Sequence, residues 1–186
     1  LVVTDVGNRS KLDEVEQCPA IVTVADTEGS VLKASDFNFW QELNQQSDQC
    51  ELVMRNLHDP FLLMFTSGTT GPAKPLEVPL KALIAFGRYM QDAIGLTEDD
   101  AFWNIADPGW AYGLYYAITG PLFLGHATLF YEGGFSTDSL CQIVKDYQIT
   151  NLAGAPTAYR MMMAADPAQM APLKGQFRVV SSAGEP

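Results

Sequence analysis

Basic residues, histidine and cysteine are all scarce in this sequence. Its 186 residues include 11 lysines and arginines against 22 acids, which gives a net charge of −11. Proteins that bind nucleic acids carry basic patches that neutralise phosphates, so this charge balance argues against a DNA or RNA partner.

The few cysteines and histidines exclude further classes of protein. Cys18, Cys50 and Cys141 lie far apart and form no C-x-x-C motif, so we expect neither a disulfide framework nor a thiolate metal site. The two histidines, His58 and His126, are each isolated from other ligand types, so no metal site is expected. Unpaired cysteines fit a reducing compartment, which favours a cytoplasmic location.

Long uninterrupted runs of apolar residues are also rare. Residues Trp110–Tyr131 carry no formal charge and are long enough to cross a bilayer, for which roughly 20 apolar residues suffice. Gly113 and Pro121 interrupt this segment, which divides at "GPLFLGHATLFYEGG" into a helical half and a strand half. We therefore expect a buried helix and strand here, and no membrane span.

Short apolar runs that alternate with helical patterns predict an α/β protein. Several runs are apolar on both faces, which is typical of strands covered by helices. Strands that alternate with helices predict a mostly parallel sheet. The expected strands are Leu1–Val6, Ala20–Ala25, Phe61–Phe65, Ala101–Ile105, Ala127–Tyr131, Ile149–Ala153 and Arg178–Ser182.

Three segments carry the periodicity of amphipathic helices. The first, Leu80–Ile94, is followed by Gly95, which predicts a left-handed turn at its end. The second, Leu140–Tyr147, follows the capping residues Ser136–Ser139. The third begins at Pro156, a residue type that suits the first turn of a helix.

The ends of the chain resemble the interior of a domain. The sequence begins "LVVTDV", without a methionine, and ends "RVVSSAGEP", which predicts a strand and its turn. We therefore expect an internal fragment of a longer protein. The most linker-like stretch is "LNQQSDQCE", Leu43–Glu51.

The segment "FTSGTTGPAK", Phe65–Lys74, carries the most specific chemistry. It follows the apolar run "FLLMF", so we expect a loop at the end of a parallel strand, where open α/β sheets bind ligands. Gly68 and Gly71 allow the backbone to approach an anion, and Lys74 adds a positive charge. Hydroxyl donors come from Thr66, Ser67, Thr69 and Thr70. This donor set favours a polyphosphate.

Two common phosphate loops do not match this segment. A Walker loop needs a serine or threonine after its lysine, whereas Pro75 follows Lys74. A dinucleotide loop needs G-x-G-x-x-G, and only Gly68-x-x-Gly71 is present. The alternative interpretation is a surface loop rich in serine, threonine and glycine that binds nothing.

The loop resembles the phosphate-loop signature of the adenylate-forming superfamily, which includes acyl-CoA synthetases, firefly luciferase and peptide-synthetase adenylation domains. Three further matches follow in the same order. Phe102–Gly134 resembles the Asp-x-Gly-Trp region of acetyl-CoA and medium-chain acyl-CoA synthetases, and "GAPTAYRMM" (Gly154–Met162) and "SSAGEP" (Ser181–Pro186) continue the series. The resemblance covers Asp59–Pro186. It implies that residues 1–186 are part of an N-terminal AMP-binding domain, with 1–58 as its lead-in and the C-terminal domain absent.

The resemblance implies a two-step reaction. A carboxylate attacks the α-phosphorus of ATP and expels pyrophosphate, and the thiol of coenzyme A then attacks the acyl-adenylate and expels AMP. Transfer of this kind depends on positioning and charge neutralisation, usually with Mg²⁺. The expected parent is an acyl-CoA synthetase of fatty acid metabolism that uses short or medium acyl chains.

Residue by residue, the resemblance assigns three groups of ligand contacts. The β and γ phosphates of ATP would contact Thr66, Ser67, Gly68, Thr69, Thr70, Gly71 and Lys74. The turn along the adenine would be Gly184, Glu185 and Pro186. The acyl pocket would be walled by Trp110, Ala111 and Tyr112, which without the resemblance would be interpreted as core residues. No catalytic residue is assigned.

The chain departs from the family pattern in ways that keep alternatives open. Pro75 stands where the family usually has glycine, and Val78-Pro79 replace a polar pair. The Tyr-x-x-Thr-Glu segment, the ribose-binding aspartate and the adenylation lysine are not in the sequence, so the fragment alone is expected to be inactive. The alternatives are a nucleotide-binding module without turnover, another adenylate-forming enzyme and a non-catalytic interaction domain.

Overall fold

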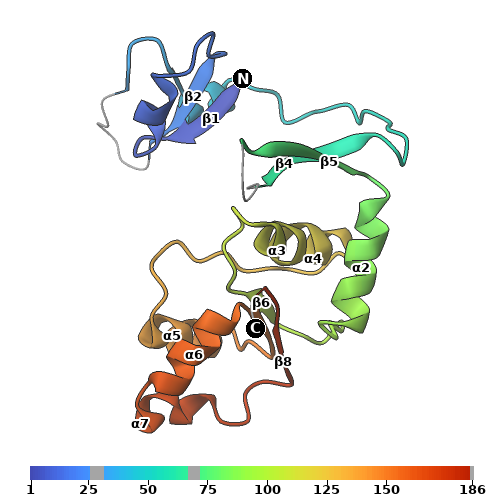
Figure 1. The fold of residues 1–186 in the computed structure, drawn as a ribbon, viewed down its shortest axis with the longest axis vertical. Helices are drawn as coiled ribbons and strands as arrows, with labels where there is room; N and C mark the ends of the chain where they lie inside the picture. Colours follow the sequence, from blue (N-terminus) through green and yellow to red (C-terminus); the bar gives the residue numbers. More distant parts are fainter. Residues whose placement is uncertain (26–31, 67–71, 185–186) are drawn as a thin grey trace. The chain divides into compact units, whose positions relative to one another are not determined.

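The structure is a computed structural model that describes residues 1–25, 32–66 and 72–184. It divides into two compact units, Leu1–Met54 and Arg55–Pro186, which are described separately (Figure 1). The predicted phosphate-loop residues 67–71 and the adenine-turn residues Glu185 and Pro186 lie outside the described ranges.

The first unit is a small parallel sheet with one covering helix. Its strands β1 (Val2–Asp5), β2 (Ile21–Val24) and β3 (Phe37–Asn38) are ordered β1-β2-β3. A 3-10 helix (Arg9–Leu12) follows β1, and α1 (Phe39–Asn44) begins where the Asn38 side chain accepts a hydrogen bond from the Gln41 amide. The two strands expected in this unit are confirmed.

An ion pair links distant parts of the first unit. The Arg9 guanidinium bonds both carboxylate oxygens of Asp36, and Thr23 donates a hydrogen bond to the same group at 3.1 Å. The Arg9 hydrogen bonds lower the pKa of Asp36 to about 2. These polar groups are satisfied by one another, which indicates a structural role.

The second unit begins with an antiparallel hairpin. Strands β4 (Pro60–Thr66) and β5 (Lys74–Pro79) pair from Pro60 opposite Pro79 to Thr66 opposite Lys74. The prediction of a parallel strand before the phosphate loop is therefore wrong. The connection from Thr66 to Lys74 is too short for the crossover of a dozen or more residues that parallel strands need, so the chain turns straight back.

A second parallel sheet forms the core of this unit. Its strands β6 (Phe102–Asn104), β7 (Asn151–Gly154) and β8 (Val179–Ser182) are ordered β6-β7-β8. All residues of β6 and β7 are buried, as the two-sided apolar pattern predicted. Two buried clusters cover the sheet, one around Leu140, Val144 and Leu152 and one around Met90 and Phe102.

The three expected helices are present, and their bounds differ from the expected ones by a few residues. In α2 (Ala82–Asp92) the chain leaves through Gly95, whose φ is 67°. Helix α5 (Thr137–Asp146) begins with a capping box between Ser136 and Ser139. Helix α6 (Pro156–Ala164) starts at the predicted proline, and α7 (Pro167–Met170) and a 3-10 helix (Ala171–Leu173) follow it.

The uncharged segment that starts at Trp110 is helical in its first half only. It forms α3 (Ala111–Gly113), the π-helix η2 (Leu114–Thr119) and α4 (Gly120–Phe123). The expected strand Ala127–Tyr131 is wrong, because this stretch lies outside the sheet and the Thr128 hydroxyl bonds the Ala117 carbonyl at 2.7 Å instead. Across the parts of the chain that the structure describes, no helix has both the length and the apolar character to cross a membrane.

A polar network closes the amino-terminal ends of β7 and β8. The Asp100 side chain, 1% exposed, forms an ion pair with Arg178 and accepts hydrogen bonds from the Thr150 hydroxyl and the Thr97 amide, each at 2.9 Å. Burial opposes the charged form of Asp100, but these hydrogen bonds outweigh it and lower its pKa. The network fixes the end of the sheet opposite the cavity described next.

Candidate ligand-binding site

A cavity of about 650 Å³ lies at the carboxyl ends of the second parallel sheet. Residues that directly follow each of the three strands line it, together with residues of α3 and α6. Its lining consists of Ile105, Ala106, Asp107, Trp110, Ala111, Tyr112, Phe135, Ala155, Thr157, Ala158, Met161, Ala183 and Gly184. Ligands of open α/β sheets bind at this end of the strands.

The lining of this cavity is mainly apolar. Aromatic and aliphatic side chains dominate it, and none of the described lining residues is basic. Burial raises the pKa of the Tyr112 hydroxyl to about 12, so this side chain is neutral at physiological pH. The cavity is therefore suited to an apolar group and poorly suited to a phosphate.

The turn after β6 shapes one wall of the cavity. The Asp107 carboxylate accepts a hydrogen bond from the Gly109 amide at 2.7 Å, which closes the turn that leads to Trp110. Helix α3 packs directly on this turn, since a Cβ atom at Gly113 would lie 2.1 Å from the Asp107 carbonyl oxygen. Glycine at position 113 allows this close approach and so places Trp110 and Tyr112 on the wall.

A groove of about 490 Å³ connects this wall to the hairpin. It is lined by Met64, Phe65, Thr66, Ala73 and Leu76 of the hairpin region and by Gly109, Trp110, Ala111 and Tyr115. Trp110 and Ala111 line both the cavity and the groove. Because Thr66 and Ala73 line this groove together with Trp110 and Ala111, both ends of the predicted phosphate loop lie near the wall of the cavity.

The predicted acyl-pocket and adenine-turn residues come together where they are described. Trp110, Ala111, Tyr112 and Gly184 all line the cavity, and Gly184 has a φ of 119°, a conformation that favours glycine. Thr66 and Lys74 are exposed and lie opposite each other at the end of the hairpin, with the Thr66 hydroxyl 3.4 Å from the Lys74 carbonyl oxygen. Lys74 lines neither the cavity nor the groove.

The sequence did not single out several residues of the cavity wall. Ala158 and Met161 are three positions apart on α6, and Phe135 comes from the segment before α5. Residues that follow a strand, or that repeat at helical spacing, can line a cavity at the end of a sheet. A single apolar residue in such a position cannot be told from a residue of the hydrophobic core by its chemistry. Within residues 1–25, 32–66 and 72–184, no group of three metal-ligating side chains is close enough to hold a metal ion.

An open parallel sheet with an apolar cavity at the carboxyl ends of its strands defines a ligand-binding α/β domain. The family model described as "AMP-binding enzyme" matches residues 1–186. The chain therefore belongs to the AMP-binding enzyme family, as the motif resemblance implied.

Named relatives within this family are acetyl- and acyl-CoA synthetases. The chain is 30% identical over 185 residues to the acetyl-coenzyme A synthetase of Helicobacter pylori strain P12, covering 93% of this chain and 28% of that protein. It is 31% identical over 171 residues to the acetyl-coenzyme A synthetase of Bdellovibrio bacteriovorus, covering 89% and 26%. The chain thus spans less than a third of the length of these relatives.

Solved structures confirm the predicted fold class. The crystal structure of the Brucella canis acyl-CoA synthetase matches with a TM-score of 0.93 and 54% identity, covering 100% of this chain and 34% of that one. The anthranilate CoA ligase AuaEII, solved with anthranoyl-AMP, matches with a TM-score of 0.85 at 18% identity, covering 98% and 36%, and supports the fold alone.

Proposed function

We propose that this chain is part of the N-terminal domain of an AMP-forming acyl-CoA synthetase with a short or medium acyl substrate. The observation that carries the proposal is the apolar cavity, which the predicted acyl-pocket residues Trp110, Ala111 and Tyr112 and the predicted adenine-turn residue Gly184 all line. The match to the Brucella canis acyl-CoA synthetase at 54% identity supports the same class.

The reaction divides between the cavity and the hairpin. One carboxylate oxygen of the substrate attacks the α-phosphorus of ATP, forming a P–O bond while the bond to pyrophosphate breaks. The coenzyme A thiol then loses its proton and attacks the acyl carbon, and AMP leaves. An apolar wall holds the acyl group, and it excludes the water that would hydrolyse the mixed anhydride.

The hairpin would supply the charge neutralisation for the first step. Thr66 and Lys74 stand opposite each other at its end, so the antiparallel pairing holds the first and last contacts of the proposed phosphate site at a fixed separation. Mg²⁺ would bind mainly through the phosphates of ATP, because the described residues offer no cluster of carboxylates for it. When bound, it neutralises charge on the phosphates.

The remaining parts of the proposal concern the protein as a whole. Acyl activation with coenzyme A suits fatty acid metabolism, and unpaired cysteines suit a cytoplasmic enzyme. The partners would be a small carboxylate, ATP and coenzyme A. Because the chain spans 28% of an acetyl-coenzyme A synthetase, all activity tests are designed for the natural full-length protein that carries it.

The test is carboxylate-dependent exchange of labelled pyrophosphate into ATP. We expect exchange with short or medium fatty acids, and no exchange without a carboxylate. Nucleotide binding without exchange for any carboxylate would instead support the binding module without turnover. A melting temperature that ATP does not raise would support the interaction domain, because a ligand specific to the native state must stabilise it.

A further inference from the structure

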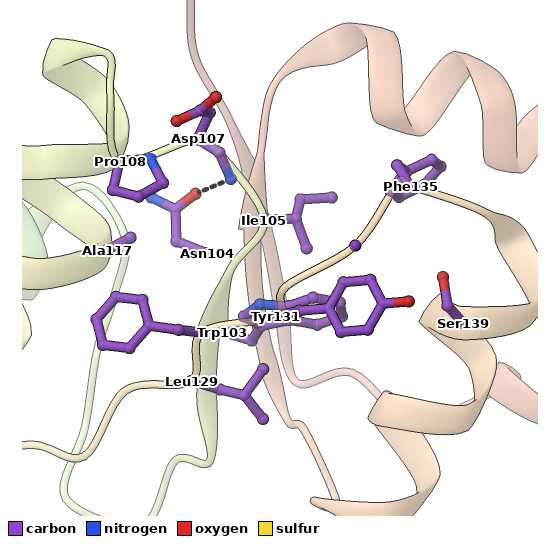
Figure 2. A pocket seen from close by; sticks show the side chains of 13 residues that line it. Trp103, Asn104, Ile105, Asp107, Pro108, Ala117, Leu129, Tyr131, Phe135 and Ser139 are labelled. Carbon is purple, nitrogen blue, oxygen red and sulfur yellow. Dashed lines mark hydrogen bonds between the residues drawn. The ribbon is translucent and has the colours of Figure 1, made fainter. Parts of the chain in front are cut away.

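A second pocket, of about 330 Å³, is lined in part by the turn that follows β6 (Figure 2). It shares Ile105, Ala106, Asp107 and Phe135 with the proposed acyl cavity, but Trp110 and Tyr112 do not line it. We call it the Asn104 pocket, and it is lined by Trp103, Asn104, Ile105, Ala106, Asp107, Pro108, Ala117, Leu129, Phe130, Tyr131, Gly133, Phe135 and Ser139.

The floor of the Asn104 pocket carries an unpaired hydrogen-bond donor. Asn104 is 3% exposed, and its Oδ1 atom accepts a hydrogen bond from the Ala106 amide at 3.0 Å, which fixes the orientation of the side chain. Its Nδ2 atom is buried and has no partner. Figure 2 shows this nitrogen on the side of Pro108 and Ala117, whose side chains contain no acceptor.

A buried amide group without an acceptor is costly, so the donor requires an explanation. The desolvation of such a group destabilises the fold unless an acceptor reaches it. Trp103 and Ala117, at 4% and 2% exposed, line the same pocket, and neither side chain carries an acceptor for this amide. An acceptor on a molecule that enters the pocket would satisfy the group.

The rim of the Asn104 pocket is aromatic and exposed. Phe130 is 59% exposed and Tyr131 is 45% exposed, so both rings present apolar surface to a ligand at the mouth. Gly133 makes room for the Tyr131 ring, since a Cβ there would lie 2.7 Å from the tyrosine hydroxyl oxygen. Aromatic rims bind planar groups by stacking or edge contacts.

The charges around the pocket select against anions. None of its described lining residues is lysine, arginine or histidine, and Asp107 carries a carboxylate at the rim. A phosphate or carboxylate would therefore be repelled. The volume is at the lower end of the roughly 300–1,000 Å³ of small-molecule pockets.

We propose that the Asn104 pocket binds a small, uncharged aryl amide or aryl carbonyl compound, with its carbonyl oxygen accepting from Asn104 Nδ2 and its ring between Phe130 and Tyr131. This site is distinct from the acyl cavity and does not depend on the proposed ligase activity. Because both pockets share the turn at Ile105–Asp107, the ligand would lie next to the acyl cavity.

The experiment uses benzamide as the probe and the natural full-length protein, without ATP, carboxylate or coenzyme A. Calorimetry is expected to show saturable one-to-one binding, and ethylbenzene, which has the ring but no acceptor, is expected to bind at least about fivefold more weakly. In protein labelled with ¹⁵N only at asparagine, benzamide should shift the Asn104 side-chain amide resonance.

Substitutions in and around the Asn104 pocket test whether benzamide binds there. Asn104→Leu keeps the volume and is expected to weaken benzamide binding by about 5- to 100-fold. Since this change also removes the acceptor of the Ala106 amide, Phe130→Ala at the exposed rim is the second variant, with Tyr147→Ala, an equally exposed tyrosine outside the pocket, as its control. Met161→Ala in the acyl cavity should leave binding unchanged.

Three results would overturn the proposal: no saturable binding, equal affinity for benzamide and ethylbenzene, or loss of binding in Met161→Ala with none in Phe130→Ala. Pyrophosphate exchange is measured separately, so a failure of this site and a failure of the ligase proposal give different results.

Discussion

Strands β4 and β7 both come from apolar runs, yet the structure uses them differently. Leu152 in β7 is 0% exposed, whereas Leu63 in β4 is 53% exposed. Strand β7 lies between two parallel neighbours and under helices, while β4 has one described partner, the antiparallel β5. Burial therefore depends on the partners of a strand and not on its own apolar content.

The difference matters for the proposed chemistry. The buried sheet provides a fixed frame, and the residues after its strands form the wall of a mainly apolar cavity. The hairpin instead presents Thr66 and Lys74 to solvent, where a charged, hydrated ligand can reach them. The apolar cavity would thus bind the acyl group, and the exposed end of the hairpin would bind the phosphates of ATP.

The largest loss of stability is expected from a cavity in the buried parallel sheet. Leu152→Ala should lower the free energy of unfolding by about 2–5 kcal/mol, because it leaves a cavity in a fully packed site. The matched change Leu63→Ala in the hairpin should cost less than about 1 kcal/mol. Urea unfolding measures both, and equal losses would contradict the contrast between the two regions.

The next largest change is expected in the adenylation rate when the charge of Lys74 on the hairpin is removed. Lys74→Ala should slow adenylation by about 100-fold, or about 2.7 kcal/mol in the barrier, while the melting temperature stays the same because the side chain is exposed. Pyrophosphate exchange in the full-length protein measures the rate. Lys81→Ala, on a lysine after β5, is the control, and unchanged kinetics in Lys74→Ala would remove this residue from the mechanism.

A smaller loss should follow from Gly113→Ala. The new Cβ would lie 2.1 Å from the Asp107 carbonyl oxygen, so α3 must move away from the turn, at a cost of about 1–3 kcal/mol. Gly134→Ala has nothing within 4 Å of its Cβ and serves as the control. Thermal unfolding compares the two variants, and equal melting temperatures would show that α3 does not pack closely on this turn.

The smallest effect concerns acid stability. The pKa of Asp100 is lowered in the folded state, so its contribution to stability is present above its unfolded pKa of about 4 and is lost as pH falls below it. Asp100→Asn should cost about 1 kcal/mol at neutral pH, since the exposed Arg178 is screened by solvent. It should also flatten the decline in stability below about pH 4. If the Asp100→Asn variant lost stability below pH 4 as steeply as the unmodified protein, Asp100 would not be the cause of the acid sensitivity.

Patterns with a local physical cause predicted the fold well. The left-handed exit at Gly95, the capping box at Ser136 and the first-turn proline at Pro156 each depend on the chemistry of a few neighbouring residues, and the structure contains all three. The motif matches also identified the family.

Features that depend on distant partners were predicted less well. Strand β5 was not expected, since Pro75 and Pro79 argue against a strand and are tolerated only at an edge. The stretch Ala127–Tyr131 has the composition of a strand but lies outside the sheet. In the same way, Asn104 gave no signal in the sequence, because its importance arises only from an unpaired amide on a buried floor.

We propose that the cavity at the carboxyl ends of β6, β7 and β8 holds the acyl group. A crystal structure of the full-length protein with an unreactive acyl-adenylate analogue, an acyl sulfamoyl adenosine, would show where the acyl chain binds. We predict that the acyl chain contacts Trp110, Tyr112 and Met161 inside this cavity. An acyl chain bound anywhere else, or side chains of the protein filling the cavity in that complex, would contradict the claim.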